Sequence, residues 1–294
     1  MTHASAAAGA GGAGPTFALA LGGGGARGLA HIHVIEALDE LGIRPVEIAG
    51  SSIGAIFGAG MAAGMRGKDI HAYAHSVLGR RSEVASRMWR SRPGSFREML
   101  DGGIRVGQFN IERILKAFLP TEIPADFEAL AIPLKVTATD YYGHDLAVMA
   151  SGDLYSALAA SAAIPAVFRP VERDGRLYID GGIYNPVPFD LIQGAADIII
   201  AIDVVGAPLE NKRGRLSGID LVFGASQLMM QSIIATKLQQ MHPAIFLRPP
   251  VSGFRALDFL KIDAVLAETV ALKDELKHAV DKAVRDRARH HHPR

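Results

Sequence analysis

Cysteine is absent from this sequence of 294 residues, and its absence removes several kinds of chemistry at once. Without a thiol the chain can form no disulfide, bind no metal through thiolates and use no cysteine nucleophile. A chain without cysteine also fits a reducing compartment, and we expect a cytoplasmic location.

A strong charge of either sign is missing as well. The formal net charge is +1, so no global electrostatic field indicates a nucleic acid, and we expect none as a partner. Hydrophobic residues make up 49% of the chain and charged residues 21%, which is typical of a globular protein with a substantial core.

Long hydrophobic runs are also lacking. No stretch of about 18 uninterrupted apolar residues occurs, so we expect no membrane-spanning helix. Residues 1–15 are rich in Ala and Gly and contain no Lys or Arg, whereas a secretory signal starts with basic residues. We therefore expect a flexible tail at 1–15, a single domain at 16–285 and a basic tail at 286–294.

Two strand–turn–helix units in the first 64 residues predict the class of fold. An apolar run at Phe17–Leu21 ends in four glycines, and apolar residues then recur at helical spacing until Gly42. A second strand at 45–49 leads into a helix at 54–63 that ends at Gly64 and is rich in small residues, which indicates that other backbone lies close to it. These units predict a three-layer α/β/α fold with a largely parallel central sheet.

Further apolar segments extend this pattern. The sequence predicts strands at 132–139, 177–179, 198–205 and 245–247, and helices at 154–163 and 263–284. Neither internal repeats nor a linker interrupt the chain, which favours one domain.

Residues 50–54 read Gly-Ser-Ser-Ile-Gly and match the G-x-S-x-G nucleophile elbow. Glycines flank the serine in this motif because a side chain would clash in the sharp turn between strand and helix. The pattern alone is weak, but here a predicted strand precedes Ser52 and a helix of small residues follows it. This context favours Ser52 as a nucleophile over an ordinary turn.

A glycine-rich loop follows the first predicted strand, with glycines at 22–25 and 28. Its spacing also fits the G-x-G-x-x-G motif of dinucleotide-binding proteins. That motif requires an acidic residue at the end of the second strand, whereas the strand here ends without one, and Glu47 lies earlier. Backbone N–H groups in such a loop suit a developing oxyanion equally well.

Residues 180–182 read Asp-Gly-Gly and come directly after a short predicted strand. The glycines allow a tight turn that leaves the carboxylate at the end of the strand. A carboxylate shielded from water and held against a serine hydroxyl can accept its proton during attack. Taken alone, the same three residues are usually only a turn.

The three motifs, in this order, resemble the patatin-like phospholipases, in particular their bacterial cytoplasmic branch. The resemblance covers 17 to about 205, including segments at 138–140, 160–165 and 185–188. The resemblance implies a patatin-like α/β/α fold. It also implies that Ser52 is the nucleophile, that Asp180 is the general base, and that the reaction requires no metal or organic cofactor. The implied oxyanion site comprises Gly23, Gly24, Gly25, Arg27 and Ile53, with Arg27 bracing the loop, and the implied supporting glycines are Gly28, Gly50, Gly54, Gly181 and Gly182. One departure is His33, where the family usually has glycine, and it could alter helix packing or the acyl pocket.

Several other polar residues are candidates for catalysis or metal binding, but structural roles are favoured for them. His242 is the histidine that could complete a conventional triad after Asp180, but it lies before a proline outside any glycine-rich setting. His71 and His75 are one helical turn apart, yet no third metal ligand is evident. We expect structural roles for Asp140, Asp203 and Ser161, and likewise for His31.

The segment 66–116 contains many more basic than acidic residues, together with Met88, Trp89 and Phe96. It could contact an anionic membrane surface, act as a lid over the acyl site, or be an ordinary solvated surface. The whole sequence predicts a serine acyl hydrolase of the phospholipase A or lysophospholipase type, acting on lipid esters through a Ser52–Asp180 dyad. The alternatives are a thioesterase or small-ester hydrolase, and a non-catalytic lipid-binding regulatory protein.

Overall fold

An eight-stranded sheet lies at the centre of the part of the chain that the computed structural model describes, residues 14–90, 109–210 and 217–290. Its strands are β1 Phe17–Leu21, β2 Glu47–Ser51, β3 Leu134–Asp140, β4 Asp145–Met149, β5 Val171–Arg173, β6 Arg176–Asp180, β7 Ile198–Ile202 and β8 Ile245–Leu247. Their order in the sheet is β5-β6-β3-β2-β1-β7-β8, with β4 paired to β3.

The pairing is parallel in the middle of the sheet and antiparallel at one side. Strand β1 runs parallel to β2 and β7, and the parallel pairing extends to β3 and β8. Strands β4, β5 and β6 join through antiparallel pairs. The prediction of a largely parallel sheet is confirmed. The order reverses at β1, because β2 lies on one side and the later β7 on the other, and ligands of open α/β sheets bind beside the carboxyl ends at such a point.

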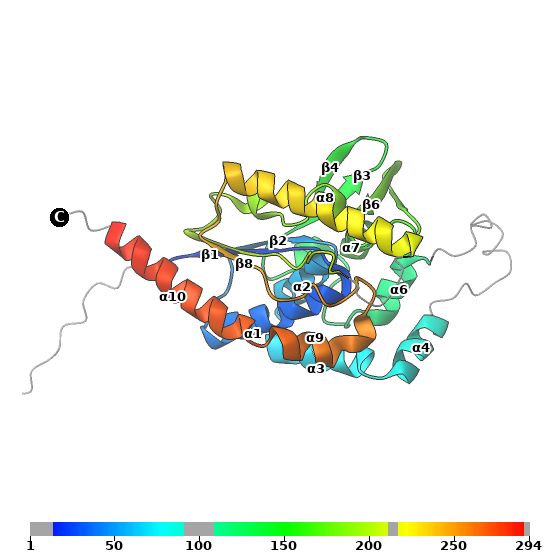
Figure 1. The fold of residues 1–294 in the computed structure, drawn as a ribbon, viewed down its shortest axis with the longest axis horizontal. Coiled ribbons are helices and arrows are strands. Elements are labelled where there is room, and N and C mark those ends of the chain that lie inside the picture. Colours follow the sequence, from blue (N-terminus) through cyan, green and yellow to red (C-terminus); the bar gives the residue numbers. More distant parts are fainter. Residues whose placement is uncertain (1–13, 91–108, 211–216, 291–294) are drawn as a thin grey trace, which may run out of the picture.

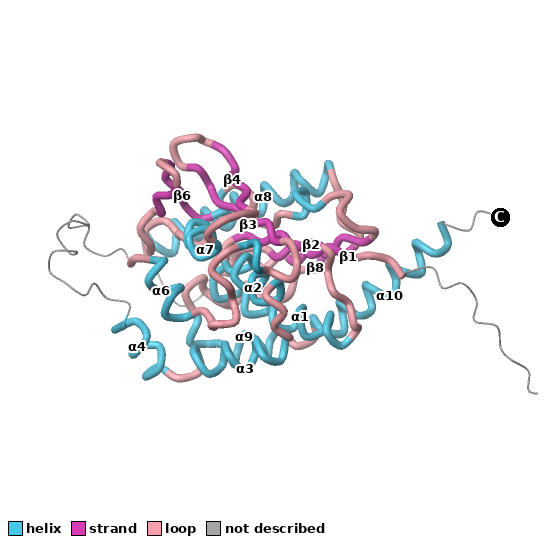
Figure 2. The backbone as a smooth tube through the Cα atoms, turned by 180° about the vertical axis from the view of Figure 1, so that it is seen from behind, coloured by secondary structure: helices cyan, strands magenta, loops and turns pink. Residues whose placement is uncertain are grey.

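Helices cover both faces of the sheet, which confirms the three-layer prediction (Figure 1). The α-helices are α1 His31–Glu40, α2 Ile53–Ala62, α3 Gly67–Leu78, α4 Arg81–Arg90, α6 Ile111–Phe118, α7 Leu154–Ser161, α8 Gly218–Gln240, α9 Ile262–Thr269 and α10 Leu272–His290. Helix α8 lies over one face, and α1 and α2 lie on the other with α3, α9 and α10 outside them, as the view from behind also shows (Figure 2). Among the helices so described, none has the length and apolar character needed to cross a membrane.

Strand β1 is buried on both faces, as central strands of parallel sheets are. Phe17, Leu19 and Leu21 belong to the larger core, which contains residues of α1 and α2. Ala18 and Ala20 face the smaller core, which contains Ile234 of α8. The large side chains of β1 therefore face the larger core, and its small side chains face the smaller one.

The C-terminal region differs from its prediction. The sequence predicts one helix at 263–284, whereas the structure has two, α9 and α10, with a break at 270–271. The Thr269 hydroxyl donates to the carbonyl oxygen of Val265 at 2.7 Å, a side-chain bond that competes with regular helix geometry. The break lets α9 contact the 3-10 helix Gly25–Ala30 while α10 packs along α1.

The expected tails have different outcomes. Helix α10 continues to His290, so the first residues of the expected tail at 286–294 are helical. The expected tail at 1–15 lies almost wholly outside the described residues.

Candidate active site

Ser52 lies in the turn between β2 and α2, where the elbow motif predicts it. Its φ of 52° and ψ of −122° are unusual for a residue with a side chain, as expected of a nucleophile elbow. The turn is crowded: a Cβ at Gly54 would lie 2.2 Å from the carbonyl oxygen of Leu21, and one at Gly50 would lie 2.5 Å from the Cα of Ala55. Glycine is required at both positions because backbone passes so close.

Ser161 holds the same turn from a different helix. Its Oγ accepts a hydrogen bond from the backbone N–H of Ser52 at 2.7 Å. Ser161 is fully buried at the end of α7, far from Ser52 in sequence. The sequence predicts a structural role for Ser161 but gives no sign of this partner.

Asp180 lies beside Ser52 and is its hydrogen-bond partner. Ser52 Oγ donates to Asp180 Oδ2 at 2.6 Å, and the backbone N–H of Gly182 donates to Oδ1 at 2.8 Å. Burial raises the pKa of Asp180 from 3.8 to about 6, and the bonds from Ser52 and Gly182 oppose part of that rise. A Cβ at Gly181 would lie 2.2 Å from the carbonyl oxygen of Thr137, so the turn after Asp180 also requires glycine. The carboxylate is thus shielded from water and aimed at the serine hydroxyl.

The glycine loop after β1 lies beside this pair. Gly25 has a φ of 60°, and a Cβ there would lie 2.2 Å from the carbonyl oxygen of Ala256. Arg27 Nε donates to the carbonyl oxygen of Gly24 at 3.0 Å, which is the brace that the resemblance implies. Because the Gly24–Gly25 peptide is planar and trans, this bond directs the Gly25 N–H away from Arg27.

The N–H groups of the predicted oxyanion site differ in availability. Gly24, Gly25 and Ile53 have backbone N–H groups that donate to no other group in the described part of the chain. The N–H of Gly23, also named in the prediction, donates to the carbonyl oxygen of Pro186 at 2.9 Å. Gly28 supports the site indirectly, since a Cβ there would lie 2.3 Å from Ile53 Cγ2.

Arg27 is buried, and its guanidinium is held by the hydrogen bond to the carbonyl oxygen of Gly24. Burial lowers its pKa to about 10, and Asp203 opposes that shift, so the side chain stays cationic at neutral pH. Asp203 accepts from the backbone N–H of Val205 at 2.9 Å and from Arg248 Nε at 2.7 Å. These bonds match the structural role expected for Asp203.

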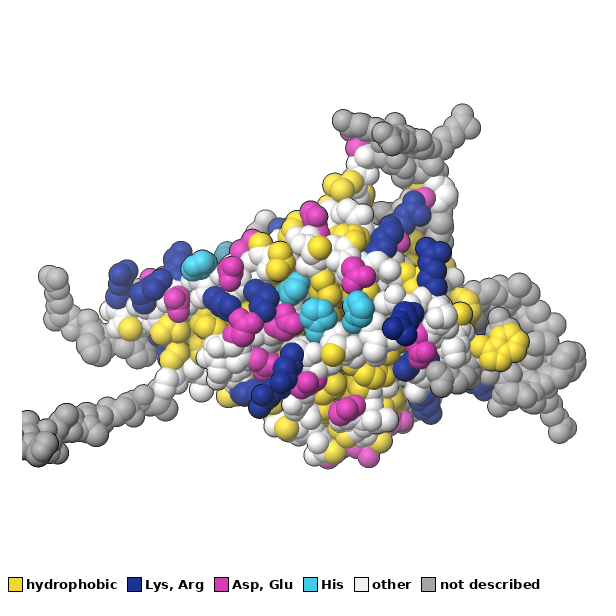
Figure 3. Space-filling model, turned by 90° about the horizontal axis from the view of Figure 1, so that it is seen from below, with side chains coloured by type: hydrophobic (Ala, Val, Ile, Leu, Met, Phe, Trp, Pro, Cys, Tyr) yellow, Lys and Arg dark blue, Asp and Glu magenta, His cyan; other side chains and the backbone are white. Residues whose placement is uncertain are grey.

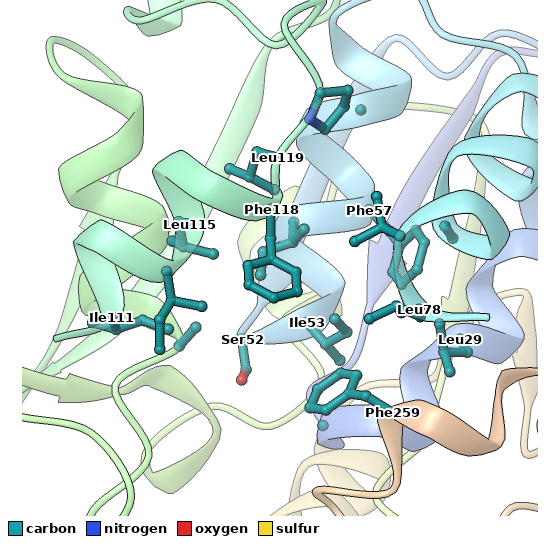
Figure 4. Close-up of a pocket in the computed structure, with 18 of the residues that line it drawn as sticks. Leu29, Ser52, Ile53, Phe57, Leu78, Ile111, Leu115, Phe118, Leu119 and Phe259 are labelled. Atoms are coloured by element: carbon teal, nitrogen blue, oxygen red, sulfur yellow. The ribbon is translucent and has the colours of Figure 1, made fainter. Parts of the chain in front are cut away.

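An apolar cavity of about 390 Å³ opens beside Ser52 (Figure 4). In the figure, Ser52 stands at the start of α2, with Ile53 and Phe57 along that helix and Leu115 and Phe118 of α6 opposite. Helices α3, α4 and α6 supply much of the lining. The predicted segment 66–116 therefore covers the cavity as far as it is described, while 91–108, which includes Phe96, lies outside the described residues.

The remaining polar candidates make structural contacts. Asp140 accepts from the Gly143 N–H and from Arg176, as expected. His242 is exposed in the loop after α8, and within the described ranges no histidine bonds to Ser52 or Asp180. The hydrogen bonds of the Ser52 and Asp180 side chains among the described residues are thus with each other and with the Gly182 N–H.

The histidines near α1 join helices to one another. His31 is fully buried and donates to the carbonyl oxygen of Gly22 at 2.9 Å, and burial lowers its pKa to about 4. His33 donates to the carbonyl oxygen of Leu266 in α9 at 2.9 Å, so the residue that departs from the family pattern ties α1 to α9. His71 and His75 contact Glu36 and Asp263 at 2.8 and 3.1 Å. Figure 3, which views the molecule from below, shows histidine side chains among charged ones on that face.

The sequence model of the family described as patatin-like phospholipase matches residues 19–192. The chain belongs to the patatin-like phospholipase family. The resemblance predicted from the three motifs is thereby confirmed, and Ser52, Asp180 and the glycine loop all fall within the matched residues. Membership in this family supports lipid acyl hydrolysis as the class of activity.

Relatives within the family are mostly longer than this chain. An uncharacterized NTE family protein of Mycobacterium tuberculosis is 41% identical over 195 residues, which cover 66% of this chain and 50% of the relative. Lysophospholipase NTE1 of Debaryomyces hansenii is 28% identical over 284 residues, covering 88% of this chain and 18% of the relative. Human patatin-like phospholipase domain-containing protein 6 is 27% identical over 283 residues, covering 86% of this chain and 19% of the relative.

Among solved structures, the chain matches human GIVD cytosolic phospholipase A2 with a TM-score of 0.43 and 11% identity. That match covers 92% of this chain and 60% of the phospholipase. VipD from Legionella pneumophila has a TM-score of 0.43 and 16% identity, with coverage of 87% of this chain and 66% of VipD.

Proposed function

We propose that this protein is a serine acyl hydrolase that cleaves lipid esters through a Ser52–Asp180 dyad and an acyl-enzyme. The observation that carries the proposal is the 2.6 Å hydrogen bond from Ser52 Oγ to Asp180 Oδ2, at the end of an apolar cavity. A buried carboxylate with a pKa of about 6 is ionised at neutral pH and can accept the serine proton.

The first half of the reaction acylates Ser52. Its Oγ forms a bond to the ester carbonyl carbon while its proton passes to Asp180. The negative charge on the carbonyl oxygen is stabilised by the N–H groups of Gly24, Gly25 and Ile53, and the loss of one such donor typically raises the barrier by about 3 kcal/mol. Collapse of this intermediate breaks the bond to the leaving oxygen, which takes the proton from Asp180 and departs as an alcohol or lysolipid.

The second half releases the fatty acid. A water molecule gives a proton to Asp180 and attacks the acyl carbon, and collapse returns that proton to Ser52 Oγ. This cycle restores both residues and needs no further group, so the proposal includes no metal or organic cofactor.

The opening of the cavity supports access from a lipid surface. Phe109 lines the cavity and is 52% exposed, and Trp89 on α4 is 69% exposed. Aromatic side chains are favoured at the membrane–water interface, and basic residues are attracted to anionic lipid. We therefore include peripheral contact with an anionic membrane surface in the proposal.

Replacement of either dyad residue tests the enzymatic proposal. We expect Ser52→Ala and Asp180→Asn each to lower ester hydrolysis by about a thousand-fold or more, because nucleophile and base act as one unit. The measurement is release of fatty acid from phospholipids and lysophospholipids by mass spectrometry, with circular dichroism as the control for folding. Near-wild-type activity in either folded variant would refute the dyad.

A fluorophosphonate probe separates the proposal from a non-catalytic lipid-binding protein. We expect the probe to label wild-type protein at Ser52 and to leave Ser52→Ala unlabelled, since labelling requires an activated serine. Absence of labelling in the wild type would favour the regulatory alternative. A panel of thioesters and small esters beside the lipids decides between the two hydrolytic alternatives.

A further inference from the structure

One face of α2 lines the cavity from its first residue to near its end. Ser52, Ile53, Ile56, Phe57 and Gly60 all contribute to the lining. This spacing places them on one side of a helix. The cavity therefore extends from the nucleophile along the axis of α2.

The length of this face can be compared with an acyl chain. Gly60 lies eight positions after Ser52, and at 1.5 Å per residue this distance is about 12 Å. An extended alkyl chain with C–C bonds near 1.5 Å advances about 1.25 Å per carbon, so about ten carbons reach from Ser52 to Gly60. Beyond Gly60, the lining continues with Met65 and Ile70.

Gly60 differs from other glycines of α2 in what surrounds it. A Cβ at Gly54 would collide with the backbone of β1, and a Cβ at Gly58 would lie 3.1 Å from Ile48 Cγ2. A Cβ at Gly60 would meet only side chains, Ile70 at 3.4 Å and Met65 at 3.8 Å, which are ordinary contact distances. Glycine lowers helix stability relative to alanine, and no close backbone requires it at this position. Gly60 therefore adds no side chain of its own to this part of the cavity lining, where Ile70 and Met65 lie within contact distance.

We propose that Gly60 determines the length of acyl chain that the protein accepts. The inference rests on the proposed function in that the occupant of the cavity is the acyl group bound to Ser52. Because Gly60 carries no side chain, an acyl chain of more than about ten carbons can pass it towards Met65 and Ile70. The substrate class is therefore a lipid ester with a long acyl chain.

A graded series at Gly60 tests this assignment with p-nitrophenyl esters of four, eight and sixteen carbons. In Gly60→Phe we expect kcat/KM for the palmitate ester to fall by roughly tenfold or more, while the butyrate ester stays within about threefold of wild type. Gly60→Ala is the mildest member of the series, because its methyl group makes only ordinary contacts, and we expect its ratio of palmitate to butyrate hydrolysis to lie between those of wild type and Gly60→Phe. An unchanged ratio of palmitate to butyrate hydrolysis in a folded Gly60→Phe protein would overturn the proposal. If Gly60→Phe does not fold, the smaller Gly60→Val takes its place with the same criterion.

Fatty-acid binding separates this inference from the proposed function. Displacement of a fluorescent fatty acid by octanoate and by palmitate is measured on wild type, on Ser52→Ala and on Gly60→Phe. We expect palmitate to displace the probe from wild type and Ser52→Ala, and to lose its advantage over octanoate in Gly60→Phe. If wild type hydrolyses no ester, the proposed function fails, and the binding ratio still decides whether Gly60 limits chain length. An unchanged ratio in Gly60→Phe counts against it.

Discussion

At the scale of single residues, the carboxylate of Asp180 combines two properties that normally oppose each other. It is buried, which disfavours its charge, and in the proposed reaction it must be ionised to accept a proton from Ser52. The pKa of about 6 is a compromise, because the group is charged at neutral pH and more basic than an exposed aspartate.

This pKa predicts a pH profile. Protonated Asp180 cannot accept the proton of Ser52, so we expect kcat/KM for a soluble short ester to rise with pH and reach half its plateau near pH 6. The measurement is initial rate between pH 4.5 and 8 on a neutral substrate. A rate that does not change between about pH 5 and 8 would show that Asp180 is not the group that titrates.

The same burial predicts a stability difference. In the unfolded chain Asp180 loses its proton near pH 3.8 and in the folded protein near 6, so between these values the folded state holds more protons and its stability falls as pH rises. In Asp180→Asn the amide oxygen can accept from the Gly182 N–H and the amide nitrogen can donate to Ser52 Oγ, so we expect this variant to be more stable than wild type above pH 6, by at most about 3 kcal/mol, with no gain below pH 3.8. Urea unfolding at pH 8 and near pH 4 measures the difference. Equal stability of the two proteins at pH 8 would contradict it.

Patterns along the chain identify some site residues and miss others for a physical reason. Ser52 and Asp180 lie in turns whose glycines are required locally, so the motifs reveal them. Ser161 acts through a hydroxyl that meets the Ser52 N–H only after α7 packs on the sheet. The carbonyl of Pro186, which occupies the Gly23 N–H, is likewise brought near by folding alone.

At the scale of elements, three helices that cover the cavity are joined through one arginine. Arg87 of α4 donates from Nη1 to the carbonyl oxygen of Ala117 in α6 at 2.7 Å and to the Tyr73 hydroxyl of α3 at 3.3 Å. Tyr73 in turn donates to the carbonyl oxygen of Phe118 at 3.1 Å. These polar contacts join helices whose cavity-facing side chains are mostly apolar.

Removal of this arginine should loosen the cover locally. We expect Arg87→Ala to weaken the packing of α4 on α6 by about 1–3 kcal/mol, since charged hydrogen bonds to a carbonyl are lost. Hydrogen exchange should become faster in residues 81–90 and 111–118 and stay unchanged in α1 and α10. Arg81→Ala, an exposed change on the same helix, is the control. Equal exchange in the two variants would mean that Arg87 does not hold the cover.

Predictions of whole elements succeed where the local pattern decides and fail where packing decides. The strand Ile245–Leu247 has its predicted bounds, because a short apolar run marks it. The small-residue helix begins one residue before its prediction, because glycines mark its two ends. The predicted helix 263–284 has continuous helical spacing, and only its contacts with two different elements divide it into α9 and α10. Helical periodicity shows which face of a helix is apolar. It does not show which element each turn packs against, so it cannot predict a break between two helices.

At the scale of the whole molecule, the carboxyl ends of β1 and β2 bring the glycine loop and Ser52 together. The antiparallel side of the sheet carries Asp180 at the end of β6. Helices α3, α4 and α6 lie on the same face of the sheet as α2 (Figure 2), and their side chains line the cavity together with those of α2. Phe109 and Leu257 line the cavity and are exposed, so a lipid that reaches Ser52 in the proposed reaction would pass them.

The single tryptophan of the chain makes this approach measurable. Trp89 is 69% exposed on α4, so its emission reports on whatever surface that helix meets. We expect the emission of the wild-type protein to shift to shorter wavelength on addition of anionic vesicles, less so with zwitterionic ones, because basic residues near α4 are attracted to negative lipid. Trp89→Ala should float with anionic vesicles several-fold less, by roughly 1 kcal/mol of lost interfacial contact, and hydrolyse a soluble butyrate ester at the wild-type rate. Unchanged emission together with equal flotation of the two proteins would place the contact surface elsewhere on the molecule.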